Sequence, residues 1–132
     1  MNNVIFIELN IQMGSFRKLI VYQKGFELLM DIFHLTKCFP KEETYSLTDQ
    51  IRRSSRSVCS CIGESYKKRR YPNHFISKLS DADMENAETQ VWLDVSLATG
   101  YITNEKFLEL DFKCEEISRL LTYMIKNPEK FL

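Results

Sequence analysis

Apolar side chains recur every three or four residues along four long segments of this chain, and this spacing limits the fold more than any other feature. Residues with that period lie along one face of an α-helix, whereas strands need strict alternation, which no segment shows. The segments are separated at Phe39-Pro40, Tyr71-Pro72-Asn73 and Gly100, and the last one ends at Asn127-Pro128. Four long amphipathic helices with short connections predict an all-α fold, an antiparallel up-down-up-down four-helix bundle.

The first two segments differ in the size of their apolar faces. The first runs from about residue 16 to residue 38, and its predicted bundle-facing residues are Leu19, Tyr22, Phe26, Leu29 and Phe33. The second is expected to begin at Ser46, whose hydroxyl would cap the helix while Asp49 completes a Ser-x-x-Asp box, and to continue to about Arg69. Its predicted core face is unusually small and consists of Leu47, Ile51, Ser55, Val58 and Ile62.

The third and fourth segments have recognisable ends. The third, the longest, runs to Thr99, and Gly100 is placed to end it in a left-handed conformation. The fourth begins after Thr103, a candidate N-cap, and its predicted core residues are Phe107, Leu110, Cys114, Ile117, Leu121 and Met124. Because 132 residues is close to the usual size of one domain, we expect a single bundle domain over residues 15–132.

Residues 1–14 are predicted to form an arm or leader peripheral to the bundle. The stretch from Val4 to Ile11 is apolar, but it lacks the basic leader and the cleavage site of a signal peptide. It is also shorter than the roughly 20 residues that a membrane span needs, so we expect no membrane partner. A short strand added to a neighbouring protein, and translated sequence ahead of a start at Met13, are the alternatives for this stretch.

The composition points to a reduced intracellular protein without a cofactor. Lys and Arg number 18, as do Asp and Glu, so bulk charge does not indicate nucleic acid. The cysteines form no CxxC pair and no zinc-type Cys/His spacing; they are Cys38, Cys59, Cys61 and Cys114. We therefore expect reduced thiols, a cytoplasmic location, no metal and no cofactor.

Catalytic patterns are weak. Asp31 and His34 have the i, i+3 spacing of di-metal bundles, but the chain has one such pair and no matching glutamates, so a bundle metalloenzyme is the least favoured hypothesis. His34 and His74 lie in different segments without a nucleophile at a recognisable spacing, and no glycine-rich phosphate loop occurs. We predict that the protein is not an enzyme.

Charge is polarised between the second and third segments. The basic stripe of the second segment consists of Arg52, Arg53, Arg56, Lys67 and Arg70. The acidic/Trp stripe of the third consists of Asp81, Glu85, Glu88 and Trp92. Small residues, Ser60 and Gly63, fill gaps between the cations and leave room for a backbone or a phosphate chain. Each feature also has an explanation that involves no partner. Lys67 to Arg70 would be a solvated helix end, the acidic residues would form a solvent-exposed helix face, and the Trp92 side chain would fold over its own helix.

Apolar residues cover more than half of the third segment's circumference, which exceeds what one core needs. They are Phe75, Ile76, Leu79, Ala82, Met84, Ala87, Val91, Leu93, Val95, Leu97 and Ala98. We expect the excess to contact a second copy of the chain. If the basic stripe met the acidic/Trp stripe of the next copy, the contact would be head-to-tail and would close into a ring. The competing hypothesis leaves the basic stripe free to bind RNA, with only Tyr66 and Tyr71 as nearby aromatic residues.

Four ordered motifs resemble a known family. They are FRKLIVYQK at 16–24, FPKEE at 39–43, YSLTDQIRRS at 45–54 and GYI at 100–102. They are similar to the four helix bundle family, also called the 23S ribosomal RNA intervening-sequence protein family, over about Phe16 to Ile125. The chain has Cys61-Ile62-Gly63-Glu64-Ser65 where that family has Asn-Ile-Ala-Glu-Gly.

The resemblance implies an antiparallel bundle assembled as a ring, typically a pentamer, with no known enzymatic activity. It also relates the chain to the accessory variability determinant proteins of retroelements, which are thought to bind a reverse transcriptase and nucleic acid. We therefore predict a non-catalytic homo-oligomeric scaffold or adaptor, with RNA or a nucleic-acid-associated protein as a further partner. The alternative prediction is an RNA-binding accessory protein that uses the basic stripe.

Overall fold

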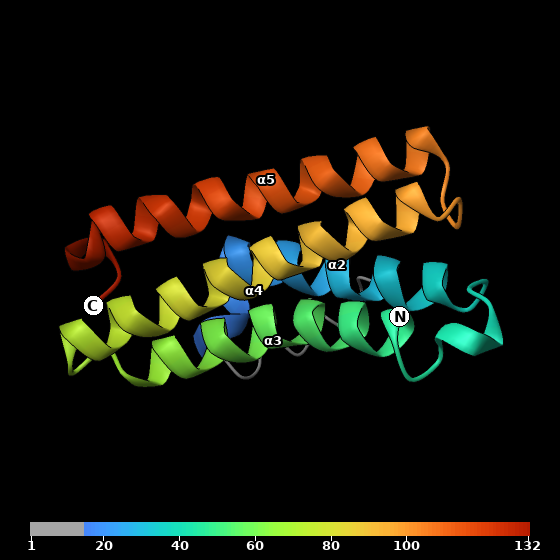
Figure 1. Ribbon diagram of the computed structural model, residues 1–132. Helices are drawn as coiled ribbons and strands as arrows, with labels where there is room; N and C mark the ends of the chain where they lie inside the picture. The colour runs from blue at the N-terminus through green and yellow to red at the C-terminus, as the bar shows by residue number, and fades with distance from the viewer. Residues whose placement is uncertain (1–14) are drawn as a thin grey trace.

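The fold is an elongated bundle of four long helices (Figure 1). The computed structural model describes residues 15–132, and the predicted arm lies outside them. The elements are the short 3-10 helix η1 (Ser15–Lys18), α2 (Ile20–Thr36), η2 (Lys41–Glu43), α3 (Leu47–Lys67), α4 (Pro72–Ala98), α5 (Asn104–Lys126) and η3 (Pro128–Lys130). Residues 15–132 contain no strand, so the all-α prediction is confirmed, and α4 is the longest helix as expected.

Consecutive helices are antiparallel. The Oγ of Ser54 lies 2.8 Å from the Oγ1 of Thr89, and further along α3 the Glu64 carboxylate lies 3.6 Å from the Lys78 Nζ, so α3 and α4 run in opposite directions. Helix α3 packs against α2 and α4, and α5 packs against α4 and α2, which closes the bundle. The predicted up-down-up-down topology is confirmed.

The predicted end of α4 at Gly100 and the predicted start of α5 after Thr103 are confirmed. Gly100 has a φ of 80°, and the N–H groups of Gly100 and Tyr101 donate to the carbonyls of Leu97 and Ser96 at 3.0 and 2.9 Å. This pair of bonds is the Schellman motif, which satisfies the last carbonyls of α4. Thr103 caps α5, because its Oγ1 accepts a hydrogen bond from the Lys106 N–H at 3.1 Å.

The predicted Ser46 cap is wrong. The Ser46 side chain makes no capping hydrogen bond, and the Leu47 N–H donates to the Glu43 Oε1 at 3.2 Å. The turn η2 carries the Glu43 carboxylate to the start of α3, where a negative charge is also favoured by the helix dipole. The other oxygen of Glu43 accepts from the Tyr101 hydroxyl at 2.8 Å, so one carboxylate joins two loops at the same end of the bundle.

The predicted apolar face of α2 is wrong by one position. The buried residues are Val21, Gly25, Leu28, Ile32 and Thr36, whereas the predicted Leu19, Tyr22, Phe26, Leu29 and Phe33 are only half-buried. Both sets have the same period, so spacing could not choose between them. A Cβ on Gly25 would lie 3.1 Å from the Cys59 Sγ, which shows how closely α2 approaches α3 on this face. The larger side chains therefore lie at the edge of the helix pair.

The predicted core faces of α3 and α5 are confirmed, with Phe107 only partly buried. The buried face of α4 is narrower and more polar than expected. It consists of Phe75, Leu79, Ala82, Asn86, Thr89, Leu93 and Ser96. Asn86 donates from Nδ2 to the Cys114 carbonyl at 2.7 Å, and Thr89 bonds to Ser54. Met84 and Val91 are 66% and 50% exposed, so α4 has apolar surface that residues 15–132 leave uncovered.

Candidate functional site

Four side chains of the basic stripe are exposed to solvent, and the fifth, Arg52, is half-buried. Arg53, Arg56 and Lys67 are exposed on the outer side of α3. Arg70 is also exposed, but it lies in the turn between α3 and α4, so the helical-wheel position assumed for it does not apply. The exposed cations of α3 are therefore available to a partner along most of the helix.

Arg52 is held by the end of α2. Its Nε donates to the Thr36 Oγ1 at 2.7 Å, and its Nη2 donates to the Phe33 carbonyl at 3.4 Å. The guanidinium carbon lies 5.0 Å from the centre of the Phe33 ring, within cation–π range. A cation that donates to a carbonyl in the last turn of a helix also interacts favourably with the negative end of the helix dipole. Arg52 thus stabilises the α2–α3 contact from a half-buried position.

A polar depression lies over the first half of α3. Its volume is about 470 Å³, and its lining consists of Thr44, Thr48, Asp49, Arg52, Arg53, Arg56, Ser57 and Ser60. The three arginines are accompanied by hydroxyl groups and one carboxylate. Such a lining suits a charged or strongly polar partner.

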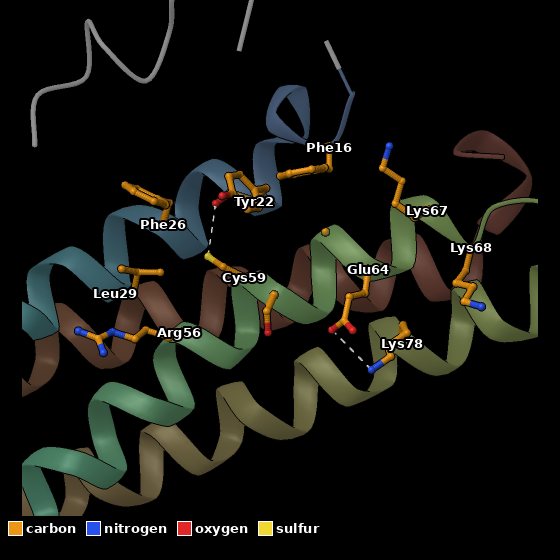
Figure 2. Close-up of a pocket in the computed structure, with 12 residues that line it drawn as sticks. Phe16, Tyr22, Phe26, Leu29, Arg56, Cys59, Glu64, Lys67, Lys68 and Lys78 are labelled. Atoms are coloured by element: carbon orange, nitrogen blue, oxygen red, sulfur yellow. Dashed lines mark hydrogen bonds and ion pairs between the residues drawn. The ribbon is translucent and has the colours of Figure 1, made fainter. Parts of the chain in front are cut away.

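A second hollow, the aromatic groove, lies between α2 and α3 (Figure 2). Its volume is about 630 Å³. The apolar part of its lining consists of Phe16, Tyr22, Phe26, Leu29, Cys59 and Gly63. The polar part consists of Arg56, Ser60, Glu64, Lys67, Lys68 and Lys78. The groove thus combines an apolar floor with a largely cationic rim.

The aromatic residues of the groove form a continuous row. The Phe16 and Tyr22 ring centres are 5.0 Å apart and edge-to-face, and the Tyr22 and Phe26 centres are 6.2 Å apart. Sequence reasoning found only Tyr66 and Tyr71 near the cations, and both rings pair with cations of their own turn, Arg69 and Lys68. The groove aromatics were missed because Phe26, the last of them, precedes Arg56, the first cation of the groove, by thirty residues in sequence. The sequence signal that could have found them is a second row of apolar side chains on α2, one residue away from the row that is buried.

Charges on the rim are unequally satisfied. The Lys78 Nζ lies 3.6 Å from the Glu64 carboxylate and 3.8 Å from that of Asp81. Arg56, Lys67 and Lys68 have no ion pair with any residue between 15 and 132. These three side chains give the rim of the groove its positive charge.

The thiol of the groove is a poor nucleophile. Cys59 is buried, its Sγ lies 4.0 Å from the Tyr22 carbonyl, and burial raises its pKa to about 12. Reactive cysteines need the opposite shift, because the thiolate is the attacking species. Cys59 therefore contributes shape and not chemistry.

The acidic/Trp stripe lies along α4, next to α3. Its members Asp81, Glu85, Glu88 and Trp92 are all half-buried. The Trp92 Nε1 donates to the Glu88 Oε2 at 3.3 Å, so the indole lies along its own helix and also packs against the core. The Trp92 side chain therefore folds over its own helix, which was one of the two positions predicted for it. The opposite charges of α3 and α4 therefore lie on neighbouring helices of one chain.

The remaining candidates belong to ordinary structural contacts. The Asp31 carboxylate accepts a hydrogen bond from the Lys113 Nζ, which also lies 3.2 Å from Glu27, while His34 is exposed. Within the described part of the chain, no three His, Cys, Asp or Glu residues are grouped to hold a metal ion. No helix between residues 15 and 132 has the length and hydropathy to cross a membrane.

Comparisons with known proteins agree with this architecture. The sequence profile of a family described as 23S rRNA-intervening sequence protein matches residues 17–123. A crystal structure from Bacteroides thetaiotaomicron, described as a protein with unknown function from the S23 ribosomal protein family, is 32% identical with a TM-score of 0.74. The match covers 81% of this chain and 96% of that chain. A comparison with curated proteins gave no match.

Proposed function

Because this chain belongs to the 23S rRNA-intervening sequence protein family, we propose that it is a non-catalytic adaptor that assembles with copies of itself. The observation that carries this proposal is the surface of α4. Met84 and Val91 are 66% and 50% exposed. They lie four residues before and three residues after Glu88, so all three are neighbours on the helix surface. Apolar side chains grouped with charged ones are typical of a surface that a partner covers.

The complementary surface is the exposed part of the basic stripe. Arg53 and Arg56 are exposed on α3 and line the polar depression, where an acidic partner would meet two cations that have no ion pair with the described residues. A contact between this surface and the acidic/Trp stripe of another copy is heterologous, and such contacts close into rings when the rotation permits. We place the assembled ring, a pentamer by family resemblance, in the cytoplasm, because all four cysteines are free.

Charge exchange tests the head-to-tail contact. We expect Arg53→Glu and Glu88→Arg each to lower the mass measured by light scattering, because each places like charges across the interface. A mixture of the two variants should have a larger mass than either variant alone, because each contact between unlike variants pairs opposite charges, while a ring of five retains at least one contact between like variants. Arg119→Glu, at an exposed position on α5, is the matched control and should leave the mass unchanged. A mixture that stays dissociated contradicts the proposed pairing.

RNA binding is the second candidate function, and the groove-rim cations that have no ion pair within residues 15–132 favour it. Arg56, Lys67 and Lys68 line one hollow and could each contact a phosphate. Three contacts to a single strand predict that the logarithm of the affinity falls with the logarithm of salt with a slope of about −2. Binding that is insensitive to salt would contradict a phosphate contact.

A further inference from the structure

An apolar hollow, the terminal groove, lies between the start of α2 and the end of α5. Its volume is about 360 Å³, and its lining consists of Lys18, Leu19, Ile20, Val21, Leu120, Tyr123, Met124 and Phe131. Lys18 is the one charged residue of that lining. An apolar cavity of about 150 Å³ holds a benzene-sized group, so the terminal groove has room for about two large side chains.

The turn after α5 forms one wall of the terminal groove. Helix α5 ends at Lys126, and η3 then brings Phe131 back to Tyr123, where the two ring centres are 6.2 Å apart and edge-to-face. The Lys130 Nζ donates to the Tyr123 hydroxyl at 2.8 Å, which fixes the same turn against α5. The groove is therefore bounded by packed side chains on both sides.

Residues 15–132 leave the opening of the terminal groove uncovered. Val21 and Met124 are buried and provide its floor, whereas Ile20 and Tyr123 are 61% and 46% exposed. Lys18 is exposed and has no ion pair with any residue between 15 and 132. Exposed apolar side chains beside a buried apolar floor are typical of a surface that another segment covers.

The sequence before Ser15 contains a segment of matching chemistry. It is the stretch of residues 4–11, which lies outside the described part of the chain, and six of its eight residues are apolar. In an extended conformation every second side chain lies on the same side. The second half of the stretch would then present only apolar side chains on one side, those of Ile7, Leu9 and Ile11.

This segment is close enough to reach the groove of its own chain. Ser15 and Lys18 belong to the same short helix η1, and the apolar stretch ends four residues before Ser15. Four extended residues span at most about 14 Å. A segment on so short a tether has a millimolar effective concentration, which favours it over the same segment of another copy. Glu8 also carries the charge opposite to that of Lys18.

We propose that residues 4–11 dock in the terminal groove of their own chain. Ile7 and Leu9 occupy its two places for large side chains, and Glu8 lies beside the Lys18 amine. The lining of the groove includes no residue of α3 or α4. Docking is therefore independent of the self-assembly proposed above and leaves the surfaces of that contact uncovered.

Photo-cross-linking in the full chain tests where the segment lies. Benzoylphenylalanine is placed at Ile20, at the opening of the groove, or at Phe112, which is 62% exposed on α5 and outside the groove. We expect irradiation to link position 20, but not position 112, to residues 4–11, as identified by tryptic digestion and mass spectrometry. On a denaturing gel the linked product should keep the mass of one chain, 15.6 kDa.

Variants of the segment separate docking from mere nearness along the chain. Leu9→Asp places a charge on the apolar side of the segment, so it should lower the yield of the cross-link from position 20 about ten-fold. Asn10→Asp adds the same charge on the other side and should leave the yield unchanged. The two variants have the same length and the same net charge.

Thermal unfolding of the full chain shows whether the segment and the groove share one contact. Leu9→Ser and Ile20→Ser should each lower the thermal midpoint by about 4 °C. Ile20 is 61% exposed, so its replacement should leave the helical circular dichroism unchanged. The double variant should fall by less than the sum of the two shifts, because the shared contact is lost only once.

The outcomes decide between the segment's own groove and other positions. A cross-link that Leu9→Asp suppresses, together with non-additive midpoint shifts, supports the docking. A linked product of twice the chain mass would overturn docking on the same chain and assign the segment to a neighbouring copy. Equal yields from Leu9→Asp and Asn10→Asp, additive midpoint shifts, or no link between position 20 and residues 4–11 would overturn the proposal.

Discussion

Neighbouring arginines on α3 are expected to behave differently when each is replaced by alanine. Arg52→Ala removes a charged hydrogen bond of 2.7 Å to the Thr36 Oγ1, a weaker one of 3.4 Å to the Phe33 carbonyl, and a cation–π contact. From the usual worth of such contacts at a half-buried site, the free energy of unfolding should fall by about 2 kcal/mol. Arg53 is exposed, so Arg53→Ala should change it by less than about 0.5 kcal/mol.

Urea unfolding followed by circular dichroism measures this difference. A loss of about 2 kcal/mol should lower the urea midpoint by about 1 M for a domain of this size. The thermal midpoint should fall by about 8 °C. All proteins are compared in dilute solution, at a concentration where light scattering gives them the same mass, so that assembly does not contribute.

Thr36 supplies the second arm of the test. Thr36→Val keeps the shape of the side chain but removes the hydroxyl that accepts the Arg52 hydrogen bond. The two changes share one interaction, so the double variant should be more stable than additivity predicts by about 1 kcal/mol. Additive effects, or an Arg52→Ala variant as stable as Arg53→Ala, would refute the assignment of Arg52 to the end of α2.

Three further predictions concern the thiols, the loops and pH. Cys38 is exposed and the other three cysteines are buried, so one thiol per chain should react quickly with an aromatic disulfide, and Cys38→Ser should abolish that fast phase. Gly100→Ala should lower the free energy of unfolding by about 1 kcal/mol because alanine is strained at a φ of 80°, whereas Gly63→Ala at a helical position should be neutral or stabilising. The hydrogen bond to Glu43 raises the pKa of Tyr101, so its stabilisation should be complete below a pH of about 10 and be lost as pH rises through the folded pKa. Alkaline unfolding of Tyr101→Phe should lack that loss.

The end of α4 and the start of α5 were predictable because each has a local cause. Gly100 ends α4 through its own positive φ, and Thr103 caps α5 with its own hydroxyl. The Ser46 cap failed because a residue outside the helix, Glu43, supplies the acceptor from the turn before it. Local sequence rules thus predict a helix end that is fixed by the residue at that end. They miss a helix end whose hydrogen-bond acceptor comes from the preceding turn.

The site was less predictable than the fold because it depends on which helix faces meet. The periods of Val21–Leu28 and Tyr22–Leu29 are identical, and only the close approach at Gly25 selects the first as core. That one-residue offset puts Tyr22 and Phe26 beside the cations of α3. The fate of Arg52 likewise depends on Thr36, which lies sixteen residues earlier in the chain.

Self-assembly through the outer surfaces of α3 and α4 is the central claim of this account. Its most direct test is the mass of the unaltered protein in solution, measured by light scattering over a range of dilutions. The account predicts a whole-number multiple of the chain mass of 15.6 kDa, with Met84 and Val91 protected in the assembled form. A mass of 15.6 kDa at every concentration would show that the exposed surface of α4 needs no second copy, and it would contradict the claim.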